Sequence, residues 1–115
     1  MRRVIAPVIT LLTISEPSLA HSPLLSSSPA AGAIVSPPSH LKLAFGEGVE
    51  RALTGVSLKC AGTEIAPVAE ATLSPDNRVL EFTLPILPKG YCSVQWHAVS
   101  VDGHRTKGEF GFMVR

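Results

Sequence analysis

The sequence has few aromatic residues and almost no excess of charge of either sign. Its 115 residues include one Trp, one Tyr and four Phe, which leaves little ring surface for a flat carbohydrate-binding face. Residues 1–20 hold two of the ten Lys and Arg and one of the nine Asp and Glu, so residues 21–115 hold eight of each. A chain without a basic field has no general attraction for nucleic acid or anionic lipid. After residue 20, no apolar run approaches the roughly 20 residues that span a bilayer, so we expect a soluble product.

The first 20 residues have the organisation of a secretory signal peptide. Arg2 and Arg3 form a positive start, residues 4–14 form a short apolar stretch, and Ser18 and Ala20 are the small residues that a signal peptidase reads. A retained membrane anchor is the alternative, but the apolar stretch is shorter than the roughly 20 residues required. We expect cleavage after Ala20, export to the periplasm, and a single mature domain of residues 21–115.

The mature region alternates apolar and polar residues with a period of two, and no stretch has a helical period. Turn-forming residues bound each alternating run, as in strands joined by tight turns. The main runs are residues 40–45, 55–60, 78–84, 91–99 and 109–114, and shorter apolar pieces are residues 24–25, 34–35 and 65–68. About seven short antiparallel strands in 95 residues predict an all-β, immunoglobulin-like Greek-key sandwich or barrel.

Only two cysteines are present, Cys60 and Cys92, and they do not form a CxxC pair. The spacing does not support a thioredoxin-like redox motif. The alternation turns both side chains inward, and an even cysteine count in an exported chain favours a disulfide. Two buried free thiols are the alternative. A Cu(I) site built from these thiols is less favoured, because both would face away from solvent.

The stretch Leu-Ala-His-Ser-Pro at residues 19–23 places His21 at the predicted mature N-terminus. A free α-amine and the imidazole Nδ1 of one residue can bind the same metal in a chelate ring, and such nitrogen pairs suit Cu(II). Further ligands are available in the Val-Ser-Val-Asp-Gly-His stretch, where Asp102 and His104 project to the same side of an extended segment. Gly103 between them permits a tight turn. Taken alone, an Asp-Gly-His sequence is more often an ordinary surface turn.

The mature sequence resembles the CopC family of periplasmic copper-binding proteins over essentially all of residues 21–115. The similar features are a histidine directly after the signal, a Ser-x-Pro-Ala motif at 27–30, Pro37-Pro38, and a Phe-x-Glu motif at 45–47. The second half is similar to the closing hairpin of the family, with Val-Ser-x-Asp-Gly-His at 99–104 and Lys-Gly-x-Phe-x-Phe at 107–112.

The resemblance implies a seven-stranded Greek-key fold and a Cu(II) site formed by His21, Asp102 and His104. Some family members have a second, Cu(I) site made of methionines and a histidine. Met113 is the only methionine in residues 21–115, so we expect Cu(II) binding alone. The resemblance further implies a role in copper resistance, sequestration or carriage, with an inner-membrane transport protein of the CopD type as a partner.

Two other functions compete with copper carriage. The first is a copper monooxygenase with a histidine brace, but an Asp ligand would fill the position that oxygen needs, and we expect no enzymatic activity. The second is a metal-free immunoglobulin-like assembly module, since many functions share such sandwiches.

The remaining polar candidates are predicted to lie at the surface. His97 follows Trp96, so it points outward from the strand, where it is a surface imidazole or approaches the metal from a neighbouring strand. His40, Glu47 and Glu50 are expected to be solvated. Trp96 is expected to anchor the core, because Val94 and Ala98 on the same face are apolar.

Overall fold

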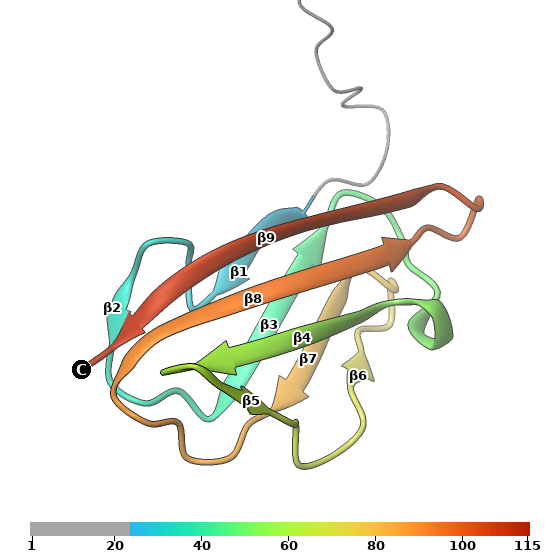
Figure 1. The fold of residues 1–115 in the computed structure, drawn as a ribbon. Helices are drawn as coiled ribbons and strands as arrows, with labels where there is room; N and C mark the ends of the chain where they lie inside the picture. The colour runs from blue at the N-terminus through green and yellow to red at the C-terminus, as the bar shows by residue number, and fades with distance from the viewer. Residues whose placement is uncertain (1–23) are drawn as a thin grey trace, which may run out of the picture.

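The structure, a computed structural model, describes residues 24–115 as a sandwich of two β-sheets (Figure 1). The predicted signal peptide and His21 lie outside these residues. In sheet order, the four strands of the first sheet are β1 (Leu24–Ser28), β3 (His40–Phe45), β7 (Val79–Thr83) and β6 (Thr72–Leu73). The five strands of the second are β2 (Ile34–Val35), β9 (Arg105–Val114), β8 (Gly90–Val99), β4 (Gly55–Cys60) and β5 (Thr63–Ile65).

The all-β sandwich predicted from the alternation is confirmed, with two differences. Neighbouring strands are antiparallel except that β2 runs parallel to β9. The described residues form nine strands instead of about seven, because two-residue pieces such as β6 are too short to show an alternation. The only helical element in residues 24–115 is the 3-10 turn η1 (Arg51–Leu53). These residues contain no helix that is long and apolar enough to cross a membrane.

The core lies between the sheets and consists mainly of strand residues that the alternation turned inward, to which Val49 and Leu87 add from outside the alternating runs. Its largest fully buried members are Phe45, Phe112, Leu41, Leu43, Leu80 and Leu87. Trp96 is 8% exposed and packs edge-on against Phe45, with ring centroids 5.7 Å apart, so its predicted role as a core anchor is confirmed. Its cross-strand partner is Gly108, where an added Cβ would come within 2.8 Å of the indole ring. The glycine therefore makes room for the indole.

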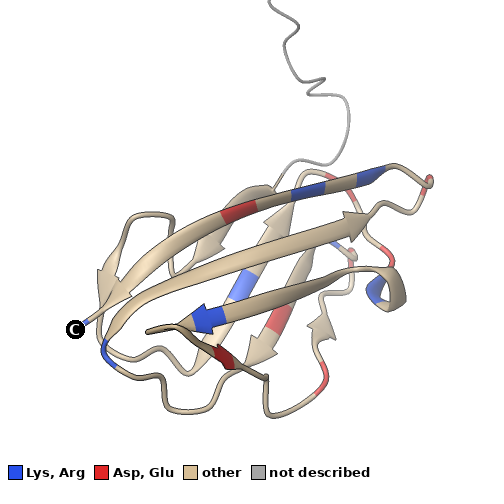
Figure 2. Cartoon of the chain, in the orientation of Figure 1, with Lys and Arg blue, Asp and Glu red and all other residues tan. Residues whose placement is uncertain are grey.

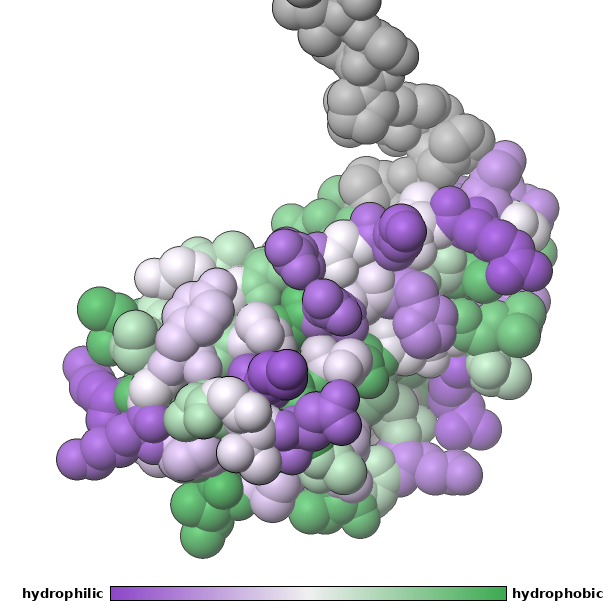
Figure 3. Space-filling model, viewed as in Figure 1, coloured by the Kyte–Doolittle hydropathy of each residue, from purple (hydrophilic) through white to green (hydrophobic). Residues whose placement is uncertain are grey.

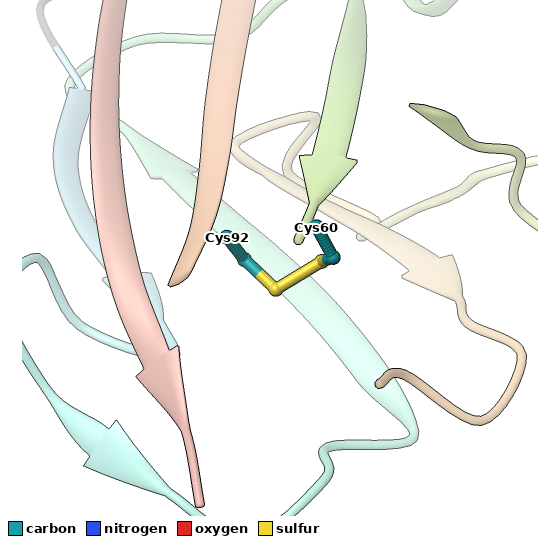
Figure 4. Close-up of a disulfide and its surroundings, with 2 residues drawn as sticks. All are labelled: Cys60 and Cys92. Carbon is teal, nitrogen blue, oxygen red and sulfur yellow. A yellow bond between two sulfur atoms is a disulfide. The ribbon is translucent and has the colours of Figure 1, made fainter. Parts of the chain in front are cut away.

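Cys60 and Cys92 form the predicted disulfide and are both fully buried. They are direct partners on neighbouring strands, so the bridge links β4 to β8 within one sheet (Figure 4). Its location is close to the start of β8. The turn between β8 and β9 is at the other end of the same strand.

The outer face of the five-stranded sheet is predominantly hydrophilic. Figure 3 shows hydrophilic side chains interspersed with residues of intermediate hydropathy over this face, and more hydrophilic side chains around the turn between β8 and β9. His97 and Gln95 of β8 both point outward here and are exposed. This pattern follows from the alternation, because every second residue of each strand faces away from the core.

Candidate metal centre

The candidate site begins with the turn between β8 and β9, which covers residues 100–104. The Ser100 N–H donates to the His104 carbonyl over 2.8 Å, and the Gly103 N–H donates to the Ser100 carbonyl over 2.9 Å. Gly103 has a φ of +92°, a backbone conformation that side-chain-bearing residues rarely adopt. Ten residue pairs between β8 and β9 extend from this turn along the sheet, so the turn is fixed to a long, regular hairpin.

The side chains of the turn form a connected polar network. The Ser100 hydroxyl donates to Oδ1 of Asp102 and accepts from the His104 N–H over 3.0 Å. The same Asp102 oxygen lies 3.0 Å from Nδ1 of His104. A carboxylate can only accept, so Nδ1 carries the proton in this contact and Nε2 keeps the lone pair that can bind a metal.

A second segment, the loop after β3, approaches the turn from the other sheet. The Val101 N–H donates to the Gly48 carbonyl over 3.0 Å, and Val49 forms an isolated β-bridge with Ser100. On its other side, the Val49 N–H donates to the Asn77 carbonyl over 2.8 Å. A Cβ at Gly48 would lie 3.3 Å from Asn77 and 3.4 Å from Val101, which is tighter than ordinary contact. The loop is thus held closely between two turns.

These two segments bring three potential ligands together. Glu47, Asp102 and His104 each offer one ligand atom, and these atoms all lie within 4.8 Å of one another. Glu47 is half-buried, whereas the Asp102 and His104 side chains are 52% and 45% exposed. Figure 2 shows acidic positions on the turn and on the loop after β3, at the same end of the molecule. One imidazole and two carboxylates are N and O donors, the type that Cu(II) accepts in tetragonal geometry.

The electrostatics of the turn favour an ionised carboxylate at Asp102. The hydrogen bond from the Ser100 hydroxyl is the main cause that lowers the pKa of Asp102 below its ordinary value. Partial desolvation opposes this shift, while the charge and hydrogen bonds of His104 add to it. A carboxyl group must be deprotonated to bind a metal, so these contacts keep Asp102 in the form that can act as a ligand.

The sequence predictions for the site have different outcomes. The structure brings Asp102 and His104 together, while His21 lies outside the described residues. Glu47, which was expected to be solvated, is half-buried, because the loop after β3 lies against the turn. The available signal was the Phe-x-Glu motif at 45–47, which contributed to the resemblance but was given no role in the site.

The other histidines of residues 24–115 lie outside this cluster. His97 is exposed and faces the bare backbone of Gly55, where an added Cβ would come within 3.1 Å of its ring. His40 is exposed as predicted, and its Nε2 lies 3.6 Å from a Glu81 oxygen on the neighbouring strand β7.

The fold and these residues define a small two-sheet β-domain with a candidate metal centre at one end. The family model described as "CopC domain" matches residues 24–115, and the chain belongs to the CopC family.

Similar proteins include the Copper resistance protein C of Xanthomonas campestris pv. juglandis, which is 35% identical over 98% of this chain and 97% of that protein. The crystal structure of CopC from Methylosinus trichosporium OB3b superposes with a TM-score of 0.74 at 34% identity, covering 82% of this chain and 93% of the other. The Copper transport protein CutJ of Bacillus subtilis strain 168 is 25% identical over 93% of this chain, but this is only 20% of CutJ.

Proposed function

We propose that this protein, once exported to the periplasm and cleaved after Ala20, binds Cu(II) and serves in copper resistance, sequestration or carriage. The proposed ligands are the α-amine and imidazole of His21, the imidazole of His104 and a carboxylate oxygen of Asp102. Glu47 supplies a further carboxylate beside them. Membership of the CopC family and the similarity to a copper resistance protein support copper as the metal.

The observation that carries this proposal is where the chain enters the sandwich. The first described residue, Leu24, is paired with Phe45, which precedes Glu47 by two residues. His21 precedes Leu24 by three residues, and three extended residues span at most about 10–11 Å. Leu24 therefore lies at the same end of the sandwich as Glu47, Asp102 and His104, which supports the proposal that His21 can reach them. A start at the opposite end would have made the chelate impossible.

Several features favour Cu(II) alone over a mixed Cu(II) and Cu(I) protein. Thioether sulfur is the soft ligand that selects Cu(I), and Met113 is the only methionine after residue 20. Met113 pairs with Tyr91, nine residues along β9 from His104, so it lies roughly 30 Å away along the strand. The described candidate ligands are all nitrogen and oxygen donors, as Cu(II) prefers.

The ligand set favours carriage over catalysis. Two nitrogen donors of His21, one of His104 and a carboxylate already make four ligands, the number of a square-planar Cu(II) site. Little room is left for oxygen to bind, so we propose that the protein is not an enzyme.

We further propose that the copper passes to or from an inner-membrane transport protein of the CopD type. The support is the CutJ relative, in which the region similar to this chain is one fifth of a protein named as a copper transporter. Copper uptake should be measured in cells that express such a transporter with the wild-type chain, with His104→Ala, or with no added chain. Uptake that is the same in all three would contradict the partnership.

Electron paramagnetic resonance of the exported, Cu(II)-loaded protein tests the site. We expect an axial signal with several nitrogen ligands, and we expect His21→Ala and His104→Ala each to change it. Intact mass should first establish that the exported chain starts at His21. An unchanged signal in either variant, or a chain that starts elsewhere, would contradict the proposed ligand set.

A further inference from the structure

Ser100 differs from every other polar residue between Leu24 and Arg115 in its burial. It is 1% exposed, and it is the only polar or charged residue of that stretch that is buried. A buried hydroxyl is costly unless it is hydrogen-bonded, so its partners explain its presence. The two partners of this hydroxyl are Asp102 and His104.

The contacts of Ser100 constrain both residues at once. Its hydroxyl donates to Oδ1 of Asp102, which fixes the orientation of the carboxylate, and accepts from the His104 N–H over 3.0 Å. Its backbone N–H donates to the His104 carbonyl over 2.8 Å. The β-bridge between Ser100 and Val49 ties the same residue to the loop that carries Glu47. Through its side chain and its backbone together, this one buried residue joins the elements that supply all three described candidate ligands.

We infer that Ser100 is a positioning residue of the copper site, which holds Asp102 and His104 in their binding arrangement before the metal arrives. This inference rests on the proposed function and adds a residue that does not itself touch copper. Without the hydroxyl, the Asp102 side chain would regain rotational freedom that copper binding must then remove. The His104 N–H would also lose its hydroxyl partner.

The consequence is a loss of copper affinity in protein that still folds. Removing a hydrogen-bond partner of a metal ligand typically lowers metal affinity about 10–100-fold, and we expect Ser100→Ala to fall in this range. The dissociation constant for Cu(II) is measured by competition with a chelator of known affinity. Ser57→Ala is the matched control, because Ser57 is an exposed serine on β4 and should leave the affinity unchanged.

A second pair of variants separates the hydroxyl from the space that it fills. Ser100→Thr and Ser100→Val both add bulk at this buried position, but only Thr keeps the hydroxyl. We expect the Ser100→Thr variant to bind Cu(II) at least about 10-fold more tightly than the Ser100→Val variant. Thermal unfolding of the metal-free variants checks that Thr and Val are folded to the same extent. This pair decides the question even if Ser100→Ala folds poorly.

A double-mutant comparison supplies a readout that a purely structural role would not produce. In an Asp102→Ala background, we expect Ser100→Ala to cost much less affinity than it does in the wild type, because the carboxylate that it orients is gone. An undiminished cost would overturn the inference, and so would equal affinities of the Thr and Val variants.

His104→Ala distinguishes failure of this inference from failure of the proposed site. If His104→Ala weakens Cu(II) binding while Ser100→Ala binds like wild type, the positioning role is wrong and the site stands. If His104→Ala also binds like wild type, the site itself is wrong and the inference falls with it.

Discussion

The two ends of the sandwich are held together by different kinds of interaction. Where β8 begins, Cys60 and Cys92 are joined covalently and are fully buried. Where β8 ends, a hydrogen-bonded network joins Ser100 to Asp102 and His104, and the latter two side chains are about half exposed. A covalent link in the core contributes to stability, whereas exposed donors on a fixed turn can exchange water for a metal. Stability and metal binding should therefore respond to substitutions at different ends of the molecule.

The largest effect is expected from removal of the disulfide. This change tests most directly whether stability and metal binding depend on different ends of the molecule. The bridge closes a loop of 32 residues, and a loop of that length corresponds to about 3–4 kcal/mol of unfolding free energy. Cys60→Ala combined with Cys92→Ala should lower the unfolding free energy by about this amount in urea titrations. Copper affinity of the folded variant should change little, because seven residues of β8 separate Cys92 from the turn. A large loss of affinity would show that the two ends are coupled.

The next effect is on the metal end alone and depends on pH. The α-amine and imidazole nitrogens must lose their protons to bind Cu(II). At a pH low enough for all three nitrogens to be protonated in the metal-free protein, affinity should fall by up to about 1,000-fold for each pH unit, since three protons are displaced. Asp102 should not add to this loss near neutral pH, because its pKa is lowered from an already acidic value. Competition titrations at several pH values measure the slope, and a constant affinity would contradict binding through these nitrogens.

A smaller effect is expected at Glu47, which lies on the loop after β3 at the metal end of the sandwich. Glu47→Gln keeps the shape of the side chain and removes its charge, so copper affinity should fall about 10-fold or more. Glu50→Gln is the matched control, because Glu50 follows on the same loop and is exposed. Neither variant should change the midpoint of thermal unfolding appreciably. Equal copper affinities of the two variants would exclude Glu47 from the site.

Glu47 also shows how far the sequence predicts this site. Period-two alternation placed Cys60, Cys92 and Trp96 on inward faces correctly, because burial of one face of a strand follows directly from sequence. The proximity of Asp102 to His104 was likewise predictable, since the two are only two residues apart. The approach of the loop after β3 depends instead on hydrogen bonds between distant backbone groups, such as the one from Val101 to Gly48. Backbone contacts of this kind leave no pattern in the residue types.

The role of Ser100 was hidden for the same reason. A serine at the end of a strand is usually exposed, and the sequence does not show that this one is buried beneath the turn. Its importance follows from the geometry of the hairpin, which directs the hydroxyl toward the Asp102 carboxylate and the His104 N–H. The sequence predicted the candidate ligands of the turn, but not the residue that orients them.

The smallest effect is expected at the turn between β6 and β7, which contacts the loop that carries Glu47. Asp76 accepts from the Ser74 hydroxyl over 2.6 Å and from the Arg78 N–H over 3.2 Å, and the neighbouring Asn77 carbonyl accepts from the Val49 N–H.

The Ser74 hydrogen bond is the main cause that lowers the pKa of Asp76 from its ordinary value of 3.8. The unfolded chain therefore binds this proton more readily than the folded one. The resulting stability is present above pH 3.8 and is lost as the pH falls through the lower folded-state pKa. Urea midpoints of the wild type and Asp76→Asn should thus differ slightly at neutral pH and converge in acid. A difference that persists unchanged in acid would show that the Asp76 charge does not stabilise this turn.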